Sequence, residues 1–375
     1  MDFAKYRLSS TEHVLTPCLL GYPDIIKHNI QEAIRIARSA QRLRPHVKTH
    51  KSSRIIGLMK DLGVTKHKCA TLAEAHMLAL AKASDVLIAY PLVGPATDHA
   101  VRLIESFPDT KFYLVVDNTT TAKVLSQAMN ERLPKTIEVL IDVDTGMHRT
   151  GAPVTQVAEL LDLLTHLQGL VPSGFHIYDG QNHQPSLEER ESAVGKILAD
   201  LRPLADQFKA SCADNCLMVC GGTPTFPVFA QVCDELSDCT IELSPGTFVL
   251  NDFNYGRDYR DMDCFQPAAL MLSRVISIGS NQHYTIDLGY KAVASDPPAR
   301  SRCHFVNIHA EEVQHSEEHL VIRVLDNTVL ELGDLVYVQP AHICPTVALH
   351  CEMQIVIDGQ VNESWPIDAR DRFYR

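Results

Sequence analysis

One basic stretch organises this chain: Arg44-Pro45-His46-Val47-Lys48-Thr49-His50-Lys51. It opens with a proline, continues through residues of strand character, and reaches a lysine that small and polar residues follow. In a parallel α/β protein, the residue at the C-terminal tip of a strand faces the mouth of the sheet, where ligands bind. Neighbouring cations and partial desolvation favour the neutral amine of a lysine. The stretch therefore predicts a lysine nucleophile for a carbonyl compound, and the alternative is a solvated basic surface.

Eight short apolar segments with turn residues after them run through the first two thirds of the chain, and helical patterns follow most of them. These segments are 43–48, 67–70, 86–90, 112–116, 137–143, 174–178, 216–220 and 240–243. Alternation of strands and helices predicts an α/β fold, namely a (β/α)8 barrel of the TIM type. A length of about 240 residues also suits that barrel.

The pattern changes after about residue 254, where strand-like segments follow one another with little helix between them. We therefore predict a second, C-terminal, mostly β domain. The expected boundaries are an N-terminal arm at 1–16 that packs with the β domain, the barrel at 17–254, and the β domain at 255–375.

The charge balance restricts the possible partners. The chain has 375 residues, of which 34 are basic and 46 acidic, so its formal net charge is −12. This balance argues against nucleic acid and against anionic membrane surfaces as partners. The first residues carry no apolar segment, and the eleven cysteines are irregularly spaced. We therefore expect a cytoplasmic protein with reduced thiols and a small-molecule substrate.

Glycine and hydroxyl residues end the last two predicted barrel strands. Gly222 and Thr223 follow segment 216–220, and Gly246 and Thr247 follow segment 240–243. Glycines allow backbone N–H groups to approach a phosphate, and barrels commonly bind phosphate with the loops after strands seven and eight. The alternative is a pair of ordinary turns.

Two further strand ends carry residues that suit a flat, anionic ligand. Arg149 lies in the glycine-bounded loop 144–151, and its planar fork can hold a phenolate or a carboxylate. Tyr178 ends segment 174–178, where its ring can stack on a flat cofactor. A surface ion pair for the arginine and plain packing for the tyrosine are the alternatives.

Four motifs together resemble one enzyme family. They are Pro45-His46-Val47-Lys48-Thr49-His50, the loop Asp144-Thr145-Gly146-Met147-His148-Arg149-Thr150-Gly151, Gly221-Gly222-Thr223-Pro224 and Pro245-Gly246-Thr247. The chain is similar to the D-threonine aldolase and D-serine dehydratase family of fold-type III pyridoxal phosphate enzymes, whose barrel resembles that of alanine racemase. The resemblance implies that Lys48 carries the cofactor, that Arg149 contacts its 3′ oxygen and that Tyr178 packs on its pyridine ring. It implies a phosphate site made of Gly222, Thr223, Gly246 and Thr247.

The same resemblance implies one divalent metal ion. His342 and Cys344 match the metal ligands of the family. An imidazole and a thiolate suit Zn²⁺, with manganese or magnesium as alternatives, and leave positions open for a substrate. The cysteine resembles the dehydratase side of the family, whereas the run Tyr178–His183 resembles the aldolase side. His183 is the candidate catalytic group that takes the proton of the substrate hydroxyl.

The preferred activity is that of a D-threonine aldolase, which cleaves this D-amino acid into glycine and acetaldehyde. The alternatives are a dehydratase of D-serine or D-3-hydroxyaspartate, an isomerase like alanine racemase, and a non-catalytic pyridoxal phosphate carrier. The resemblance also implies a homodimer with shared active sites, in which His342 and Cys344 reach the neighbour's Lys48.

Overall fold

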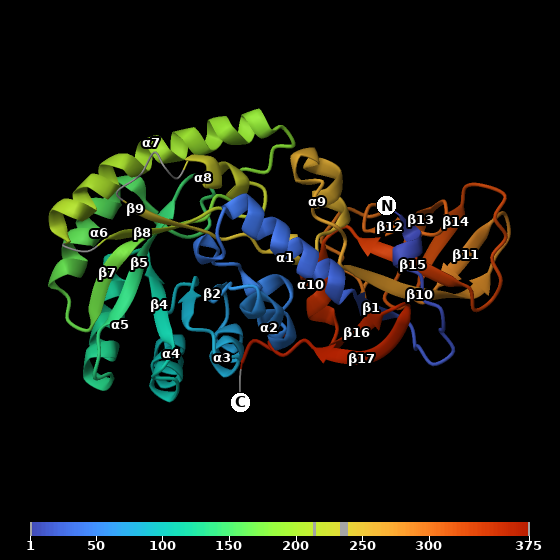
Figure 1. Cartoon of the computed structure of the whole chain (residues 1–375), viewed down its shortest axis with the longest axis horizontal. Coiled ribbons are helices and arrows are strands. Elements are labelled where there is room, and N and C mark those ends of the chain that lie inside the picture. The colour runs from blue at the N-terminus through green and yellow to red at the C-terminus, as the bar shows by residue number, and fades with distance from the viewer. Residues whose placement is uncertain (1, 213–214, 233–238, 374–375) are drawn as a thin grey trace. The chain divides into compact units, whose positions relative to one another are not determined.

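A computed structural model of the chain describes residues 2–212, 215–232 and 239–373 (Figure 1). Residue contacts divide it into two units. The barrel unit comprises Ala33–Lys48, Ile56–Gly246 and Asp371–Arg375, and the sheet unit comprises Met1–Glu32, Thr49–Ile55 and Thr247–Arg370.

The barrel unit contains a parallel sheet with the strand order β2-β3-β4-β5-β7-β8-β9, and a short strand, β6, pairs with β5. The strands are β2 Lys66–Cys69, β3 Asp85–Ile88, β4 Lys111–Val116, β5 Ile137–Asp144, β6 Ala152–Pro153, β7 Leu170–Ile177, β8 Cys216–Cys220 and β9 Cys239–Leu243. Buried residues dominate both faces of β4 and β8, as expected for strands enclosed by helices.

The segment before Lys48 joins the two edge strands of this sheet. Leu43 bridges Leu243 of β9, and His46 bridges Lys68 of β2, both in parallel. Backbone hydrogen bonds of 2.8 and 2.9 Å run to both neighbours. With the seven strands of the sheet, this segment gives the predicted α/β barrel, and the expected fold class is confirmed.

The first barrel strand is nevertheless shorter than the predicted segment 43–48. Two isolated bridges replace it, and Val47–Thr49 forms a turn of 3-10 helix, η3. Pro45 has no N–H group and therefore cannot donate a ladder hydrogen bond. Lys48 thus lies in a helical turn and not at the tip of a regular strand.

Helices follow most of the barrel strands, as the periodicity predicts. They are α1 Pro23–Ala37, α2 Ser53–Asp61, α3 Leu72–Leu80, α4 Pro95–Ser106, α5 Thr119–Arg132, α6 Val154–His166, α7 Leu187–Ser211 and α8 Phe226–Val232. Local sequence sets several of their starts: the side chains of Thr71, Asn118 and Ser186 each accept a hydrogen bond from a backbone N–H in the first turn. None of the helices that the structure describes has the length and apolar character needed to cross a bilayer.

The sheet unit is built on nine mostly antiparallel strands in the path β13-β14-β11-β10-β1-β16-β17, with β15 pairing both β10 and β12. They are β1 Cys18–Gly21, β10 Ala269–Ile278, β11 His283–Ile286, β12 Cys303–Phe305, β13 Ala310–His315, β14 Leu320–Val324, β15 Leu335–Pro340, β16 Glu352–Ile357 and β17 Gln360–Pro366. Two short helices belong to this unit, α9 Phe253–Asp258 and α10 Ile343–Leu349. The second, mostly β part of the predicted fold is therefore present.

Residues before the barrel contribute to this sheet. Strand β1 pairs antiparallel with β10 and parallel with β16. Tyr6 and Leu8 pack in a buried cluster with Leu20, Leu270 and Tyr337. The backbone N–H of Leu8 also donates to the Tyr337 hydroxyl at 3.0 Å. The N-terminal segment is therefore part of the core of the sheet unit.

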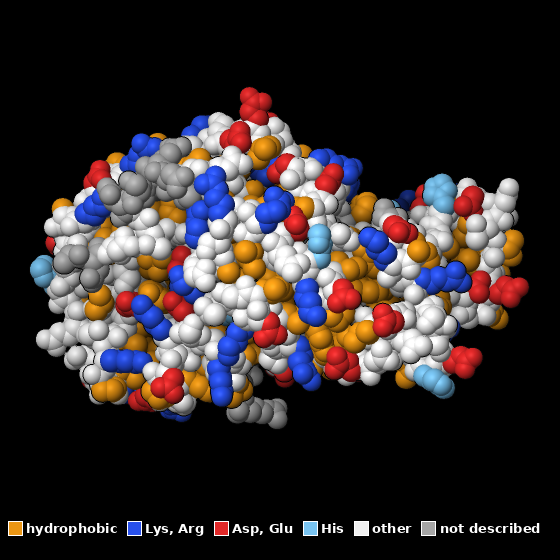
Figure 2. Space-filling view, in the orientation of Figure 1, with side chains coloured by type: hydrophobic (Ala, Val, Ile, Leu, Met, Phe, Trp, Pro, Cys, Tyr) orange, Lys and Arg blue, Asp and Glu red, His pale blue; other side chains and the backbone are white. Residues whose placement is uncertain are grey.

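Surface charges are mixed. On the face shown in Figure 2, acidic and basic side chains are interspersed among polar and apolar ones.

Candidate active site

Lys48 is half-buried in η3 of the barrel unit. Its backbone N–H donates to Nδ1 of His46 at 3.2 Å. This hydrogen bond and the bridges at Leu43 and His46 fix the backbone that carries the lysine. Its amine lies over the ring of Tyr178, 5.5 Å from the ring centroid.

The basic neighbours of Lys48 in the sequence do not form the charged cluster that we expected. The guanidinium of Arg44 is buried and forms ion pairs of 2.5 Å with both Glu242 and Asp85. Burial lowers the pKa of His50 to about 3, so this imidazole is neutral near pH 7. The cations that surround Lys48 come instead from distant parts of the chain.

Three cationic groups converge on the ring of Tyr178. The Nζ atoms of Lys48 and Lys68 each lie 5.5 Å from the ring centroid, and Cζ of Arg149 lies 4.9 Å from it. None of the three cations forms an ion pair with any residue that the structure describes. Such a cluster favours an anionic ligand, because like charges held together are costly until an anion neutralises them.

Glycines on two loops make room for the Tyr178 ring. A Cβ atom at Gly180 would lie 2.7 Å from Cε1 of Tyr178, which is closer than such atoms approach, and a Cβ at Gly222 would touch Cε2 at 3.4 Å. Asp179 is anchored beside the ring, since its carboxylate accepts hydrogen bonds from Thr225 at 2.9 Å and Asn182 at 3.2 Å. The ring orientation is therefore set by its own loop and by the loop after β8.

A buried polar chain runs from Lys68 into the barrel. The amine of Lys68 lies 3.4 Å from Nε2 of His176, whose Nδ1 lies 2.7 Å from Oδ1 of Asp142. Thr150 donates to Oδ2 of the same carboxylate at 3.0 Å. An N–H of His176 that faces Asp142 leaves Nε2 as an acceptor for Lys68.

The pKa values along this chain follow from burial and from the neighbouring charges. Burial and the positive charge of Lys48 lower the pKa of Lys68 to about 7. Burial and Lys68 lower the pKa of His176. Burial opposes ionisation of Asp142, but the His176 imidazole and the hydrogen bonds that the carboxylate accepts lower its pKa overall. Near neutral pH the chain therefore ends in a lysine that can exist as the neutral amine.

The loop that presents Arg149 is held by one carboxylate. Oδ1 of Asp144 accepts from the backbone N–H groups of Gly146 and His148, both at 3.0 Å. Nδ1 of His148 lies 2.8 Å from the other oxygen. This turn follows β5 directly, which explains how a residue of an exposed loop reaches the Tyr178 ring.

The predicted phosphate residues of the barrel unit lie in two adjacent turns. The N–H of Gly222 donates to Oγ1 of Thr225 at 3.2 Å, and that of Gly246 donates to Oγ1 of Thr223 at 3.1 Å. Gly221 has a φ of +78°, a conformation that favours glycine at the end of β8. Threonine hydroxyls of the two turns thus accept both of these backbone N–H groups.

His183, the predicted proton acceptor, lies in the exposed loop after β7. Its backbone N–H donates to the carbonyl oxygen of Gln181 at 3.1 Å. Its place in the loop gives its side chain access to solvent.

The predicted metal ligands lie at the start of α10 in the sheet unit. Nδ1 of His342 lies 2.5 Å from Oδ2 of Asp296. Burial opposes protonation of His342, but its hydrogen bonds with Cys344 and Asp296 raise its pKa to about 9. Cys344 Sγ lies 3.2 Å from Oγ1 of Thr49 and 3.7 Å from Oγ1 of Thr247. The structure therefore brings the two predicted ligands together, with Thr247 beside them.

The pair supplies one nitrogen and one sulfur donor, and this donor set suits Zn²⁺. Within the described residues, no group of three or more histidine, cysteine, aspartate or glutamate side chains could hold a metal ion. A metal at His342 and Cys344 would thus have two protein ligands, fewer than the three of a usual catalytic zinc site. Water or substrate would have to complete its coordination.

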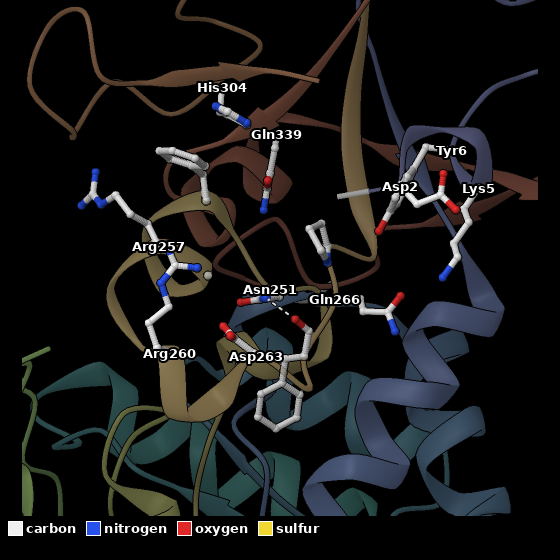
Figure 3. A pocket seen from close by; sticks show the side chains of 14 residues that line it. Asp2, Lys5, Tyr6, Asn251, Arg257, Arg260, Asp263, Gln266, His304 and Gln339 are labelled. Atoms are coloured by element: carbon white, nitrogen blue, oxygen red, sulfur yellow. Dashed lines mark hydrogen bonds between the residues drawn. The ribbon is translucent and has the colours of Figure 1, made fainter. Parts of the chain in front are cut away.

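The sheet unit also has a pocket of about 570 Å³ (Figure 3). Phe253 and His304 stack in it with their ring centroids 4.2 Å apart. The buried Gln339 and the exposed Arg257 and Arg260 also line it. None of the residues that we predicted for the active site is among its lining residues.

Lys68, His176 and Asp142 did not emerge from the sequence analysis. One signal was available for Lys68: the segment Lys66-His67-Lys68-Cys69 is basic, although a parallel barrel strand is normally apolar. Charged residues on such a strand indicate a buried partner or a ligand. His176 and Asp142 lie on strands that read as ordinary barrel strands, so only their contacts distinguish them.

Comparison with known proteins defines the class. The model of the alanine racemase N-terminal domain matches residues 23–235, which is more than half of the chain. The chain belongs to this family of barrel proteins. A second model, of a serine dehydratase domain, matches residues 268–356. The two matches together place the chain in the D-threonine aldolase and D-serine dehydratase group of fold-type III enzymes, as the motifs indicate.

Individual relatives extend over nearly the whole chain. A D-threonine aldolase from Arthrobacter sp. is 28% identical, covering 88% of this chain and 85% of its own. A D-threo-3-hydroxyaspartate dehydratase from Delftia sp. is 26% identical, with coverages of 93% and 96%. The crystal structure of a D-threonine aldolase from Filomicrobium marinum superimposes with a TM-score of 0.81 at 26% identity, covering 95% of both chains. Two further solved structures are of a D-threo-3-hydroxyaspartate dehydratase, a cysteine mutant in the metal-free form and a histidine mutant, with TM-scores of 0.80 and 0.81 at 21% identity.

Proposed function

We propose that this protein is a pyridoxal phosphate-dependent lyase that acts on D-3-hydroxy amino acids, with cleavage of D-threonine to glycine and acetaldehyde as its preferred reaction. The observation that carries the proposal is the group of two lysine amines and one guanidinium around Tyr178, none of which forms an ion pair with a described residue. Pyridoxal phosphate is flat, anionic and carries an aldehyde, so it complements a ring, two positive groups and an amine. One relative is named an aldolase and another a dehydratase, and both activities belong to the lyase class.

Each predicted residue has a physical role toward the cofactor. Lys48 holds it through its amine, and the fork of Arg149 binds the 3′ oxygen. Tyr178 packs on the pyridine ring. The N–H groups and hydroxyls of Gly222, Thr223, Gly246 and Thr247 bind the phosphate. When bound, the cofactor supplies an electron sink for the bond that breaks at Cα of the substrate.

We assign the substrate hydroxyl to His183 and to a divalent metal at His342 and Cys344. A divalent metal bound to a substrate hydroxyl would lower the pKa of that hydroxyl, and a histidine could then accept the hydroxyl proton. In the aldolase reaction, loss of this proton accompanies cleavage of the Cα–Cβ bond. In the dehydratase reaction, Cα loses a proton and hydroxide leaves Cβ; a divalent ion held by His342 and Cys344 would supply positive charge for that departure.

A product assay tests the function directly. We expect D-threonine to yield glycine and acetaldehyde in equal amounts, with glycine measured by mass spectrometry and acetaldehyde by a coupled alcohol dehydrogenase. Formation of 2-oxobutanoate and ammonia without glycine would establish the dehydratase instead. Racemisation of alanine without either product would establish the isomerase. Cofactor absorbance without turnover of any of these substrates would identify a carrier.

A specific observation keeps the dehydratase as second candidate. The proposed ligand pair here, His342 and Cys344, is a histidine and a cysteine, and these are also the residue types substituted in two solved structures of a D-threo-3-hydroxyaspartate dehydratase, of which the cysteine mutant is metal-free. Thiolate ligands favour zinc over harder metals. D-Serine and D-threo-3-hydroxyaspartate should therefore be assayed beside D-threonine.

Chelation tests the metal. Because the barrel residues would hold the cofactor without the metal, we expect a chelator to stop turnover while the visible absorbance of the bound cofactor persists. His342→Ala should behave in the same way. His319→Ala, which alters an exposed histidine of the same unit, is the matched control and should keep both metal content and rate. Full rate in metal-depleted enzyme would refute the metal role.

We also propose a homodimer whose subunits share their active sites. If His342 serves the neighbour's Lys48, mixing Lys48→Ala and His342→Ala subunits restores about a quarter of the wild-type activity, because half of the dimers are mixed and each has one intact site. A mixture without activity would place both residues in the site of a single chain. Sedimentation of a fully active monomer would refute the dimer.

A further inference from the structure

The buried amine of Lys68 has a setting that the proposed roles do not use. Lys68 is the third residue of β2, and only 1% of its surface is exposed. A buried lysine normally pairs with a carboxylate. Here its amine lies 3.4 Å from a ring nitrogen of His176, and it forms no ion pair with the residues that the structure describes.

The charges around this amine come from several elements. Lys48 of η3 and Arg149 of the loop after β5 share the Tyr178 ring with it. The pKa of this amine also depends on Asp142 of β5, Asp179 after β7 and Cys220 of β8. Asp142 is engaged by His176 and Thr150, Asp179 is held by Thr225 and Asn182, and burial raises the pKa of the Cys220 thiol.

We propose that Lys68 is the proton-exchanging amine of the cofactor site, which takes up a proton when an anionic ligand enters and which His176 and Asp142 hold in place. The inference rests on the proposed cofactor class. In the ligand-free site a third positive charge beside Lys48 and Arg149 is unfavourable. An anion that neutralises those two groups removes this penalty, and the amine then binds a proton from solvent.

The geometry supports this direction of transfer. With the N–H of His176 directed to Asp142, Nε2 offers one lone pair to Lys68, so the lysine keeps a hydrogen bond as either amine or ammonium. Burial and Lys48 place the pKa of Lys68 at about 7. At pH 8 the amine is therefore mostly neutral before the ligand binds. The protein therefore takes up at most about one proton for each anion bound.

Isothermal titration calorimetry measures this uptake. The probe is pyridoxamine 5′-phosphate, which has the ring and the phosphate of the cofactor but no aldehyde, so it forms no bond with Lys48. The full-length protein, freed of cofactor, is titrated at pH 8 in two buffers with different ionisation enthalpies. The difference between the two enthalpies gives the number of protons bound per site.

The variants isolate the lysine. Wild type should take up between about half a proton and one proton more than Lys68→Met. Lys68→Arg is already charged and should bind without this uptake, so it tests the proposal even if Lys68→Met binds weakly or folds poorly. Lys123→Met, which alters an exposed lysine on α5, should behave as wild type.

The outcomes separate this inference from the proposed function. Binding with the same uptake in wild type, Lys68→Met and Lys68→Arg would overturn the role of Lys68 while leaving the cofactor assignment intact. Lack of binding by the wild type would overturn both. Uptake that depends on Lys68, in a protein that cleaves no D-3-hydroxy amino acid, would uphold this inference and refute the lyase reaction.

Discussion

Arg44 and Lys68 are both buried cations of the same barrel, yet their surroundings differ. Each has about 1% of its surface exposed. Arg44 forms ion pairs with Glu242 and Asp85, and these carboxylates raise its pKa although burial opposes this. Lys68 forms no ion pair with the described residues and lies against the His176 imidazole, and burial together with Lys48 lowers its pKa to about 7. A neutralised cation is part of the scaffold, whereas a cation without a counter-ion indicates where a ligand supplies the missing charge.

The largest effect should follow loss of Lys48, which we propose as the lysine that carries the cofactor. We expect Lys48→Ala to lose activity by at least about a thousandfold, because the substitution removes the amine that would bind the cofactor aldehyde. The cofactor should no longer be trapped on the protein by borohydride reduction, as measured by mass spectrometry. A reduced cofactor adduct at Lys68 in this variant would show that the two amines around Tyr178 can exchange roles.

Breaking the Arg44 network should affect stability and not binding. Arg44→Met leaves the buried carboxylate of Glu242 and the partly buried one of Asp85 with less compensation, so we expect the free energy of unfolding in urea to fall by about 3–5 kcal/mol. Arg102→Met, which removes an exposed ion pair with Asp98, is the matched control and should cost less than about 1 kcal/mol. Equal costs for the two variants would contradict the distinction between scaffold and ligand-binding cations.

Lys68 should instead change how stability depends on pH. Because its pKa is lower in the fold than in the unfolded chain, the unfolded state binds its proton between about pH 7 and pH 10 while the cofactor-free fold does not. This lysine therefore destabilises the fold in that window, and stability rises with pH by up to about 1.4 kcal/mol per pH unit. Lys68→Met should lose this rise in urea titrations at pH 7.5 and 9. An identical slope in both proteins would show that Lys68 is charged throughout.

The smallest effect concerns Arg149. Lysine at this position keeps the charge but loses the planar fork, so we expect Arg149→Lys to weaken cofactor binding about tenfold, or by about 1.4 kcal/mol. Equilibrium dialysis of the cofactor against wild type and variant measures this change. Arg102→Lys on α4 is the control. Unchanged affinity would mean that Arg149 contributes charge alone.

The alternation of strands and helices determined the barrel, because a buried parallel strand needs a continuous apolar run and its crossover needs a periodic helix. Seven of the eight predicted segments therefore correspond to β2, β3, β4, β5, β7, β8 and β9. Segment 43–48 is the exception, since Pro45 and the turn Val47–Thr49 interrupt its ladder. Strand β1 has four residues and pairs with β10 and β16, which are distant in the sequence, so no local pattern identified it.

The sequence by itself also determined which residue types follow the strands, including Arg149 and Tyr178, and the position of Lys48 after the bridges at Leu43 and His46. It could not determine which charges are neutralised, because Arg44 precedes Lys48 by four residues and yet turns to Glu242 and Asp85. Only the tertiary structure decided that the neighbours of Lys48 are Lys68 and Arg149, since the closed barrel brings the ends of β2, β5 and β7 to one ring. The protonation of a buried amine depends on such neighbours and on burial, and neither is a local property of the sequence.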